Sequence, residues 1–238
     1  MLTLGIAAIA LVQPAPSAAS IVSKMIARYH GAGSMTGTIT MQQGLGTQTV
    51  SATTVLQFER PNKLYIRQSF KGEEAREVLV TCDGRHFSYN TPENLPGSEN
   101  LKRLVEAVST QFGSLDLGGV YAASSKPLLD RSVPLDLAIS RKEDLTYRRN
   151  QWATLAYAGK TALQKESVHR ITGRYRPYGE ADVTGSYEMY INEAGDLRRY
   201  TLTTQLQDSG RIMTVMGAWD VNLVVNGKPD PALFRVVR

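Results

Sequence analysis

The sequence is poor in the residues that build disulfide frameworks and metal centres. It contains one cysteine, Cys82, and three widely separated histidines, His30, His86 and His169, among 238 residues. A single cysteine excludes an internal disulfide, so the fold must be stabilised by packing. The histidines show no H-E-x-x-H spacing and the cysteine no C-x-x-C spacing, so we expect neither a metal nor a cofactor.

Motifs of catalysis and of nucleic-acid binding are also missing from the sequence. It has no G-x-S-x-G motif, and the glycines at 31 and 33 lie between an expected helix and a strand, the reverse of the dinucleotide-binding order. Basic pairs at 141–142, 148–149 and 198–199 are dispersed and lack interleaved aromatic residues. We therefore expect no nucleic-acid partner and no enzyme activity.

The first nineteen residues carry no charged side chain, although they contain a run of eleven mainly apolar residues, Leu2–Val12. Small residues and prolines follow up to Ala19, which predicts a secretory signal peptide over residues 1–19. A membrane-spanning helix needs about 20 apolar residues, so this run is too short to be one. We expect residues 20–238 to form a single periplasmic domain, whose net charge of +5 would favour peripheral contact with anionic membranes.

Alternating apolar residues predict that the first part of this domain is a meander of strands. Ser20 is expected to cap a helix with apolar residues at helical spacing, which ends at Gly31. The period then changes to two, and Asp83-Gly84 supplies a tight turn. The expected strands cover residues 35–41, 50–58, 64–70, 78–82 and 87–89.

Helical spacing returns in the middle of the chain, where we expect a helical insert at about 98–150. Its first helix, 98–113, would carry apolar residues at i, i+3, i+4 and i+7, and a second would cover 135–145. Further strands are expected over residues 152–158, 168–175, 187–191, 200–206 and 213–221. Strands that alternate apolar and polar residues have one face to bury, which predicts an α+β fold with helices on that face.

Three segments resemble the LolA-like family of periplasmic lipoprotein carriers. Arg60-Pro61-Asn62 follows a strand, a strand then leads through Asp83-Gly84 to an aromatic-rich strand ending in Tyr89-Asn90, and the chain closes on Pro229–Phe234. The resemblance implies an incomplete antiparallel barrel of about ten or eleven strands, with helices packed on its concave face. It also implies that Arg60 contacts helix backbone in a covering lid.

The resemblance further implies that acyl chains of lipoproteins, or another hydrophobic ligand, bind between sheet and lid. Membrane-bound donor or acceptor proteins would be the partners. Burial contributes about 0.8 kcal/mol per methylene, so such carriage requires no catalytic group. The expected ligand-binding residues are Ile39, Met41, Leu56, Phe58, Leu64, Ile66, Val78, Val80, Phe87, Tyr89, Leu101, Leu104, Val105, Val108, Tyr187, Met189, Leu202, Met213, Val215 and Trp219.

Three alternatives remain open. The same fold could serve as a periplasmic sensor or interaction module that detects lipoproteins or lipids. A hydrolase in the helical insert could use His86 and His169. The sheet could also be filled by the protein's own side chains, with Phe112 or Trp219 blocking the expected pocket.

Overall fold

The computed structural model describes most of the chain after the first fifteen residues. The expected signal peptide therefore lies almost wholly outside the described residues, as does Val108. The described residues are 16–45, 48–71, 76–92, 101–107, 109–110, 113–114, 116–124, 128, 130–141, 145, 149–176, 184–208 and 211–236.

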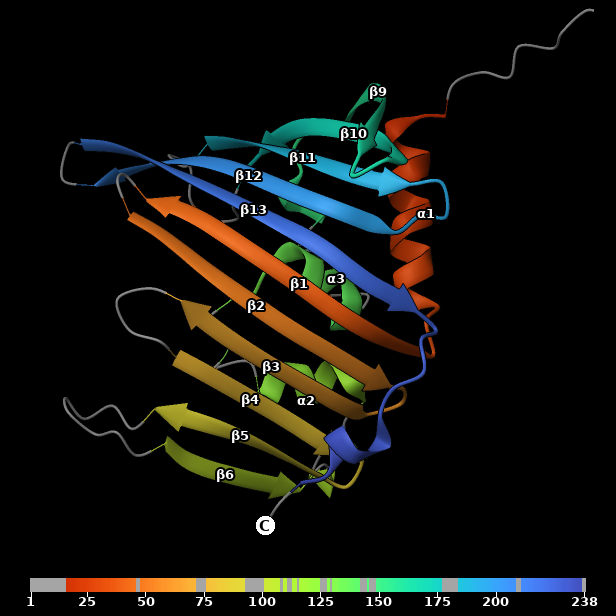
Figure 1. Ribbon diagram of the computed structural model, residues 1–238, viewed down its shortest axis with the longest axis vertical. Coiled ribbons are helices and arrows are strands. Elements are labelled where there is room, and N and C mark those ends of the chain that lie inside the picture. Colours follow the sequence, from red (N-terminus) through yellow and green to blue (C-terminus); the bar gives the residue numbers. More distant parts are fainter. Residues whose placement is uncertain are drawn as a thin grey trace, which may run out of the picture.

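In the described residues, the fold is built on one antiparallel sheet of eleven strands (Figure 1). Its order is β6-β5-β4-β3-β2-β1-β13-β12-β11-β10-β9, so β6 and β9 are its two edges and the barrel is not closed. The strands are β1 (Ser34–Leu45), β2 (Gln48–Glu59), β3 (Lys63–Lys71), β4 (Arg76–Asp83), β5 (His86–Pro92), β6 (Leu101–Ala107), β9 (Ala156–Leu163), β10 (Glu166–Tyr175), β11 (Thr184–Asn192), β12 (Leu197–Asp208) and β13 (Arg211–Val225). The predicted α+β half-open barrel is confirmed.

The sheet consists of two meanders joined through the first and the last strand. β1 pairs with β13 from Met35↔Val225 to Leu45↔Val215, whereas the other ladders join strands that follow one another along the chain. Gly37 makes a close approach possible in this central ladder, because a Cβ there would lie 2.0 Å from the carbonyl oxygen of Asn222. The predicted five-strand meander is confirmed as β1–β5.

Helix α1 (Ala18–His30) runs along one end of the strands (Figure 1). Its N-cap is Ser17, whose hydroxyl accepts a hydrogen bond from the Ser20 amide at 3.1 Å. The prediction that Ser20 is the cap is wrong, because the buried Ala18 already belongs to the first helical turn. Ile21, Val22, Met25 and Tyr29 form the buried stripe that an amphipathic helix requires.

The middle segment differs from the expected helical insert. Residues 101–107 form strand β6, paired with β5 from His86↔Ala107 to Pro92↔Leu101, so the prediction of a helix over 98–113 is wrong. Two short strands, β7 (Ser109–Thr110) and β8 (Gly113–Ser114), follow. The expected binding role of Leu101, Leu104 and Val105 remains a prediction, because their side chains lie outside the described residues.

Two helices after β8 cover one face of the sheet. Figure 1 shows α2 (Leu117–Ser124) and α3 (Val133–Ile139) on the same side of the strands. α3 is buried along its whole length, as expected for a helix that is apolar on most sides. Among the described residues, no helix has both the length and the apolar character required to cross a bilayer.

The C-terminal segment covers part of the opposite face of the sheet, which we call the outer face. Helix η1 (Pro231–Phe234) is capped by Asp230 and packs on β3 and β4. Phe234 is buried, and Thr81 of β4 and Ser88 of β5 share a buried hydrogen bond of 2.8 Å. The Pro229–Phe234 motif thus contributes to packing of the sheet.

Candidate functional site

The strand register places most of the expected ligand-binding residues on one face of the sheet. Opposite partners on neighbouring strands, such as Leu56↔Ile66 and Ile66↔Val80, continue the face from strand to strand. We call it the inner face, because α2 and α3 lie against it (Figure 1). The buried members of the expected set are Ile39, Met41, Leu56, Phe58, Leu64, Ile66, Val78, Val80, Phe87, Tyr89, Tyr187 and Met189.

Helical side chains fill the inner face at the end near α1. Met25 and Tyr29 of α1, Tyr121 of α2, and Leu135 and Ile139 of α3 are all buried in the same hydrophobic cluster as the strand residues. The Tyr29 hydroxyl accepts a hydrogen bond from the amide of Leu197 at 3.2 Å, which fastens α1 to β12. This part of the expected binding face forms the protein's core.

The inner face changes character toward the far ends of the strands. Leu202, Val215 and Trp219 are only half-buried there, and Met213 is 37% exposed. Two residues absent from the expected set share this region, namely the half-buried Phe70 and Val50, which is 39% exposed. Their place in the alternation of β2 and β3 was the signal that could have identified them.

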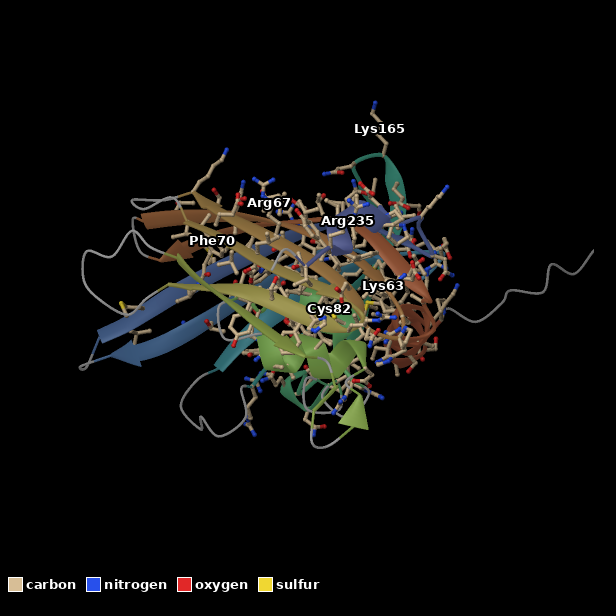
Figure 2. The ribbon with its side chains drawn as sticks, turned by 90° about the horizontal axis from the view of Figure 1, so that it is seen from below. Lys63, Arg67, Phe70, Cys82, Lys165 and Arg235 are labelled. Atoms are coloured by element: carbon tan, nitrogen blue, oxygen red, sulfur yellow. The ribbon has the colours of Figure 1, made fainter. Side chains whose placement is uncertain are left out.

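We call this region the open strip and define it as Val50, Phe70, Leu202, Met213, Val215 and Trp219. It continues across neighbouring strands, because Phe70 pairs with Ala52, Ala52 with Met41, and Met41 with Trp219. Phe70 lies toward the end of the sheet opposite α1 (Figure 2). The strip is therefore an incompletely buried apolar surface on the same face as the core.

A polar cluster separates the core from the open strip. Asp130, in the connection between α2 and α3, accepts hydrogen bonds from the Trp219 indole Nε1 at 3.2 and 3.3 Å. Gln68 of β3 donates from Nε2 to the carbonyl oxygen of Asp130 at 2.8 Å and to the hydroxyl of Thr54 at 3.1 Å. The α2–α3 connection is thus fastened to β2, β3 and β13 at the middle of the inner face.

Burial raises the pKa of the Asp130 carboxyl to about 6, and the nearby Asp136 also raises it. The hydrogen bonds from Trp219 act in the opposite direction. Asp130 therefore titrates close to neutral pH while it holds the helical cover against the sheet. Sequence reasoning missed this residue, because an aspartate in a connection between helices gives no periodic signal.

A second buried contact holds α2 to α3. The Tyr121 hydroxyl donates to Asp136 Oδ1 at 2.6 Å, and the Arg131 guanidinium lies 5.4 Å above the Tyr121 ring. Burial is the main cause that raises the pKa of Tyr121 well above its ordinary value. The two helices therefore form one unit with the Asp130 connection between them.

Arg60 makes its described contacts at the end near α1. Its Nε donates to the carbonyl oxygen of Ala32 at 2.9 Å, just after α1, and its guanidinium lies 5.4 Å from the centre of the Phe58 ring. The next residue, Pro61, accepts a hydrogen bond from the amide of Leu117 at the start of α2. Residues 101–107 of the segment expected to be its lid partner form strand β6, and the described contacts of Arg60 instead fasten the end of α1 to the sheet.

The histidines proposed for a hydrolase lie in opposite halves of the sheet, His86 on β5 and His169 on β10. His169 is buried between Tyr157, whose hydroxyl is 3.2 Å from its Nδ1, and Glu193, whose Oε2 is 3.2 Å from its Nε2. Among the described residues, no three His, Cys, Asp or Glu side chains gather as a metal site would require.

Comparison with known proteins finds similar folds but no matching family model and no matching curated protein. LprF from Mycobacterium bovis is 16% identical, with 92% of this chain and 98% of that chain covered at a TM-score of 0.46. The Mycobacterium tuberculosis lipoprotein LppX is 10% identical over 87% and 97% of the two chains, with a TM-score of 0.40. A LolA superfamily protein from Nitrosomonas europaea is 10% identical over 93% and 99%, with a TM-score of 0.32. At these identities the likeness concerns the fold alone, so function has to be argued from this chain's own residues.

Proposed function

We propose that the protein carries a hydrophobic ligand, of the class of acyl chains, between the inner face of the sheet and the α2–α3 unit. The observation that supports this most directly is the open strip. Apolar side chains on the face that forms the core elsewhere are half-buried or exposed at the strand ends remote from α1. An apolar surface that continues directly from a core is a binding site for an apolar partner.

The open strip could hold one end of an acyl chain, and the α2–α3 unit would have to yield for the rest. Each methylene transferred from water to an apolar site contributes about 0.8 kcal/mol. Each hydrogen bond that fastens Asp130 to Trp219 or Gln68 contributes about 1 kcal/mol net, or somewhat more where the partner is charged. Burial of several methylenes therefore supplies a free energy comparable to that of the hydrogen bonds that fasten the connection.

The location and the partners follow as part of the same proposal. A carrier of acyl chains operates between membranes, so we propose that the domain acts in the periplasm after removal of a signal peptide. Lipoproteins or lipids would be the cargo, and membrane-bound proteins would deliver and accept it. No chemical step is required of the protein, since binding and release suffice.

Two neighbouring residues offer a matched test of the open strip. Met213 points to the inner face and Ile212, which is 69% exposed, points to the outer face, because side chains alternate along β13. Met213→Glu would place a carboxylate on the strip, whereas Ile212→Glu places the same charge one residue away on the other face. Both variants begin from exposed apolar side chains, so their effects on folding should be similar.

Binding of a pyrene-labelled fatty acid to the delipidated protein gives the readout, together with mass spectrometry of organic extracts from detergent-free preparations. We expect Met213→Glu to weaken probe binding by about tenfold or more, because a carboxylate opposes burial beside a hydrocarbon chain. Ile212→Glu should bind as the wild type does. Equal binding by the wild type and both variants, with no lipid in the extracts, would reject the proposal in favour of a self-filled sheet.

A further inference from the structure

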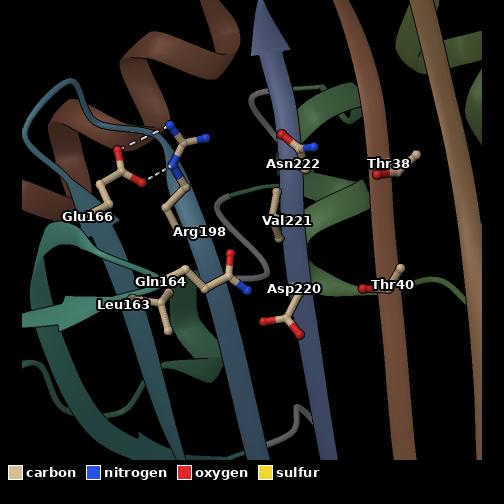
Figure 3. Close-up of a pocket in the computed structure, with 9 residues that line it drawn as sticks. All are labelled: Thr38, Thr40, Leu163, Gln164, Glu166, Arg198, Asp220, Val221 and Asn222. Atoms are coloured by element: carbon tan, nitrogen blue, oxygen red, sulfur yellow. Dashed lines mark hydrogen bonds and ion pairs between the residues drawn. The ribbon is translucent and has the colours of Figure 1, made fainter.

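A hollow of about 390 Å³ lies on the outer face of the sheet, away from the proposed acyl-chain site (Figure 3). Its floor consists of two cross-strand pairs of β1 and β13, Thr38↔Asn222 and Thr40↔Asp220. Leu163, Gln164 and Glu166 of the β9–β10 hairpin, with Arg198 of β12, form the rest of its lining together with Val221. The volume falls in the lower part of the range of small-molecule sites.

The β9–β10 hairpin forms the roof of this hollow. Figure 2 shows Lys165 at its apex, which rises from the sheet on the side opposite α2 and α3. The register of the hairpin shifts between His169 and Ile171, opposite a stretch that includes Gly159 at φ +93°. Such a bulge increases the local twist of a hairpin, and here it accompanies the turn over the outer face.

The turn at the tip of the hairpin has an unusual sequence for its backbone. Gln164 has φ 49° and Lys165 has φ 71°, so both residues of the two-residue turn are in the left-handed region. Turns of this kind strongly favour Asn-Gly or similar pairs, and other residues adopt the conformation at a cost. Backbone strain of this kind clusters at functional sites, and Gln164 lies over the hollow (Figure 3).

A second irregularity places Arg198 in the lining. Tyr190 pairs with Arg199 and Ile191 with Leu197, so Arg198 is an extra residue in β12, and bulges of this type redirect a side chain. Arg198 donates to Glu166 at 2.8 and 3.3 Å, which compensates its charge. Asp220 is partly compensated by Arg199, with a nitrogen-to-oxygen distance of 3.6 Å.

The groups that the hollow presents to a ligand are therefore mainly polar and uncharged. The side chains of Thr38, Thr40, Gln164 and Asn222 have no hydrogen-bond partner within the described part of the chain. Two hydroxyls and two primary amides can each donate and accept, as can the hydroxyl groups of a sugar. Leu163 adds apolar surface for its C–H groups.

We propose that this outer-face hollow binds a small neutral saccharide, with Asn222, Gln164 and the two threonines as hydrogen-bonding residues and Asp220 as an additional acceptor. The compensated charges disfavour an anion such as phosphate, and one partly compensated carboxylate is a weak site for a cation. The proposal does not depend on carriage of acyl chains, because the two sites lie on opposite faces of the sheet.

Protein-observed NMR with ¹⁵N labelling tests the saccharide proposal, with glucose, N-acetylglucosamine and maltose as probes. We expect at least one of them to cause saturable shifts of the Gln164 and Asn222 side-chain amides, with Kd on the order of 1 mM. Asn222→Ala should weaken this binding by about tenfold through loss of the amide hydrogen bonds. Gln205→Ala is the matched control, since Gln205 is an exposed amide farther along β12 and should leave binding unchanged.

A variant of the Gln164-Lys165 turn tests whether its strained backbone serves ligand binding. Replacing Gln164 and Lys165 together by Asn and Gly satisfies the left-handed turn, so we expect a higher Tm together with weaker saccharide binding. The proposal is overturned if no sugar gives saturable shifts up to about 50 mM. It is also overturned if Asn222→Ala binds like the wild type, if the turn variant keeps full affinity, or if inorganic phosphate or Ca²⁺ alone binds at these residues.

Discussion

Trp219 and Asp130 connect the central ladder of the sheet to its helical cover. The Trp219 Nε1 donates to both carboxylate oxygens of Asp130, at 3.3 and 3.2 Å, from the middle of β13 to the α2–α3 connection. Trp219 belongs to the open strip, and Asp130 is a buried acid. Changes to either residue should therefore be visible in stability, in pH dependence and in the environment of the indole.

The Asp130 carboxyl is expected to make the protein more stable in mild acid than at neutral pH. Burial raises its pKa from 3.8 to about 6, so the folded protein holds this proton more tightly than the unfolded chain does. The free energy of unfolding should therefore fall as the pH rises from about 4 to about 6, by on the order of 3 kcal/mol. Urea unfolding across this range, with Asp130→Asn beside the wild type, measures the effect.

In Asp130→Asn the pH dependence from this group should disappear, while the amide oxygen can still accept from Trp219. Asp220→Asn, on the outer face, serves as the control and should keep the profile of the wild type. Parallel profiles for the wild type and Asp130→Asn would show that the carboxyl is not the group responsible.

Gly217→Ala is expected to move the Trp219 indole. A Cβ at Gly217 would lie 2.5 Å from the indole ring, closer than any real contact, so the ring must shift. Its bonds to Asp130 should then lengthen, with a loss of about 1 to 2 kcal/mol of stability. The ¹H shift of the Trp219 indole N–H reports the movement, and the Trp152 indole N–H provides an internal reference that should stay in place.

Arg60→Leu is expected to destabilise the protein through the end of α1. The variant loses the hydrogen bond to the Ala32 carbonyl, a charge-assisted contact worth about 1.5 to 3 kcal/mol, and leaves that oxygen without this donor. Arg67→Leu removes an exposed arginine that is paired with Glu77, and should cost at most about 1 kcal/mol. Chemical denaturation measures the free energy of unfolding of both variants, and equal losses of stability would contradict the assigned role of Arg60.

The N-cap of α1 allows a test of how much the first turn of the helix stabilises the protein. Ser17→Ala removes the acceptor for the Ser20 amide and should cost about 1 kcal/mol. A chain that begins at Ser20 should lose at least as much relative to one that begins at Pro16, because it also lacks the buried Ala18. Thermal unfolding of the two chains measures the difference, and identical Tm values would show that the first turn is dispensable.

The strands were predictable because alternation is a local signal. Met35 to Met41 and Leu64 to Phe70 alternate over lengths that only a half-buried strand explains, and their register follows from short connections. The segment around Leu101 was misassigned because residues at i and i+4 share a face in a strand as well as in a helix. Pairing with β5 decides its structure, and that pairing depends on residues distant in the sequence.

The candidate site was predictable only as a set of residues that share a face. Alternation placed Leu56, Val80 and Met189 on one buried face, but the division between core and open strip depends on where α2 and α3 lie. The hydrogen bonds of Asp130 and the bulge at Arg198 depend on tertiary contacts and leave no periodic pattern in the sequence. The choice of Ser17 over Ser20 as the cap likewise depends on the burial of Ala18.

The pairing of β1 with β13 determines when the sheet can be completed. Each meander can zip up from local hairpins, but the ladder that unites them joins residues almost two hundred positions apart, such as Met35 and Val225. In a polypeptide emerging from a ribosome or a translocation pore, the edge of β1 that faces away from β2 stays unpaired until β13 has appeared. Contacts of such long sequence separation slow folding and leave a strand edge prone to aggregation, so a holding chaperone should raise the yield of native protein.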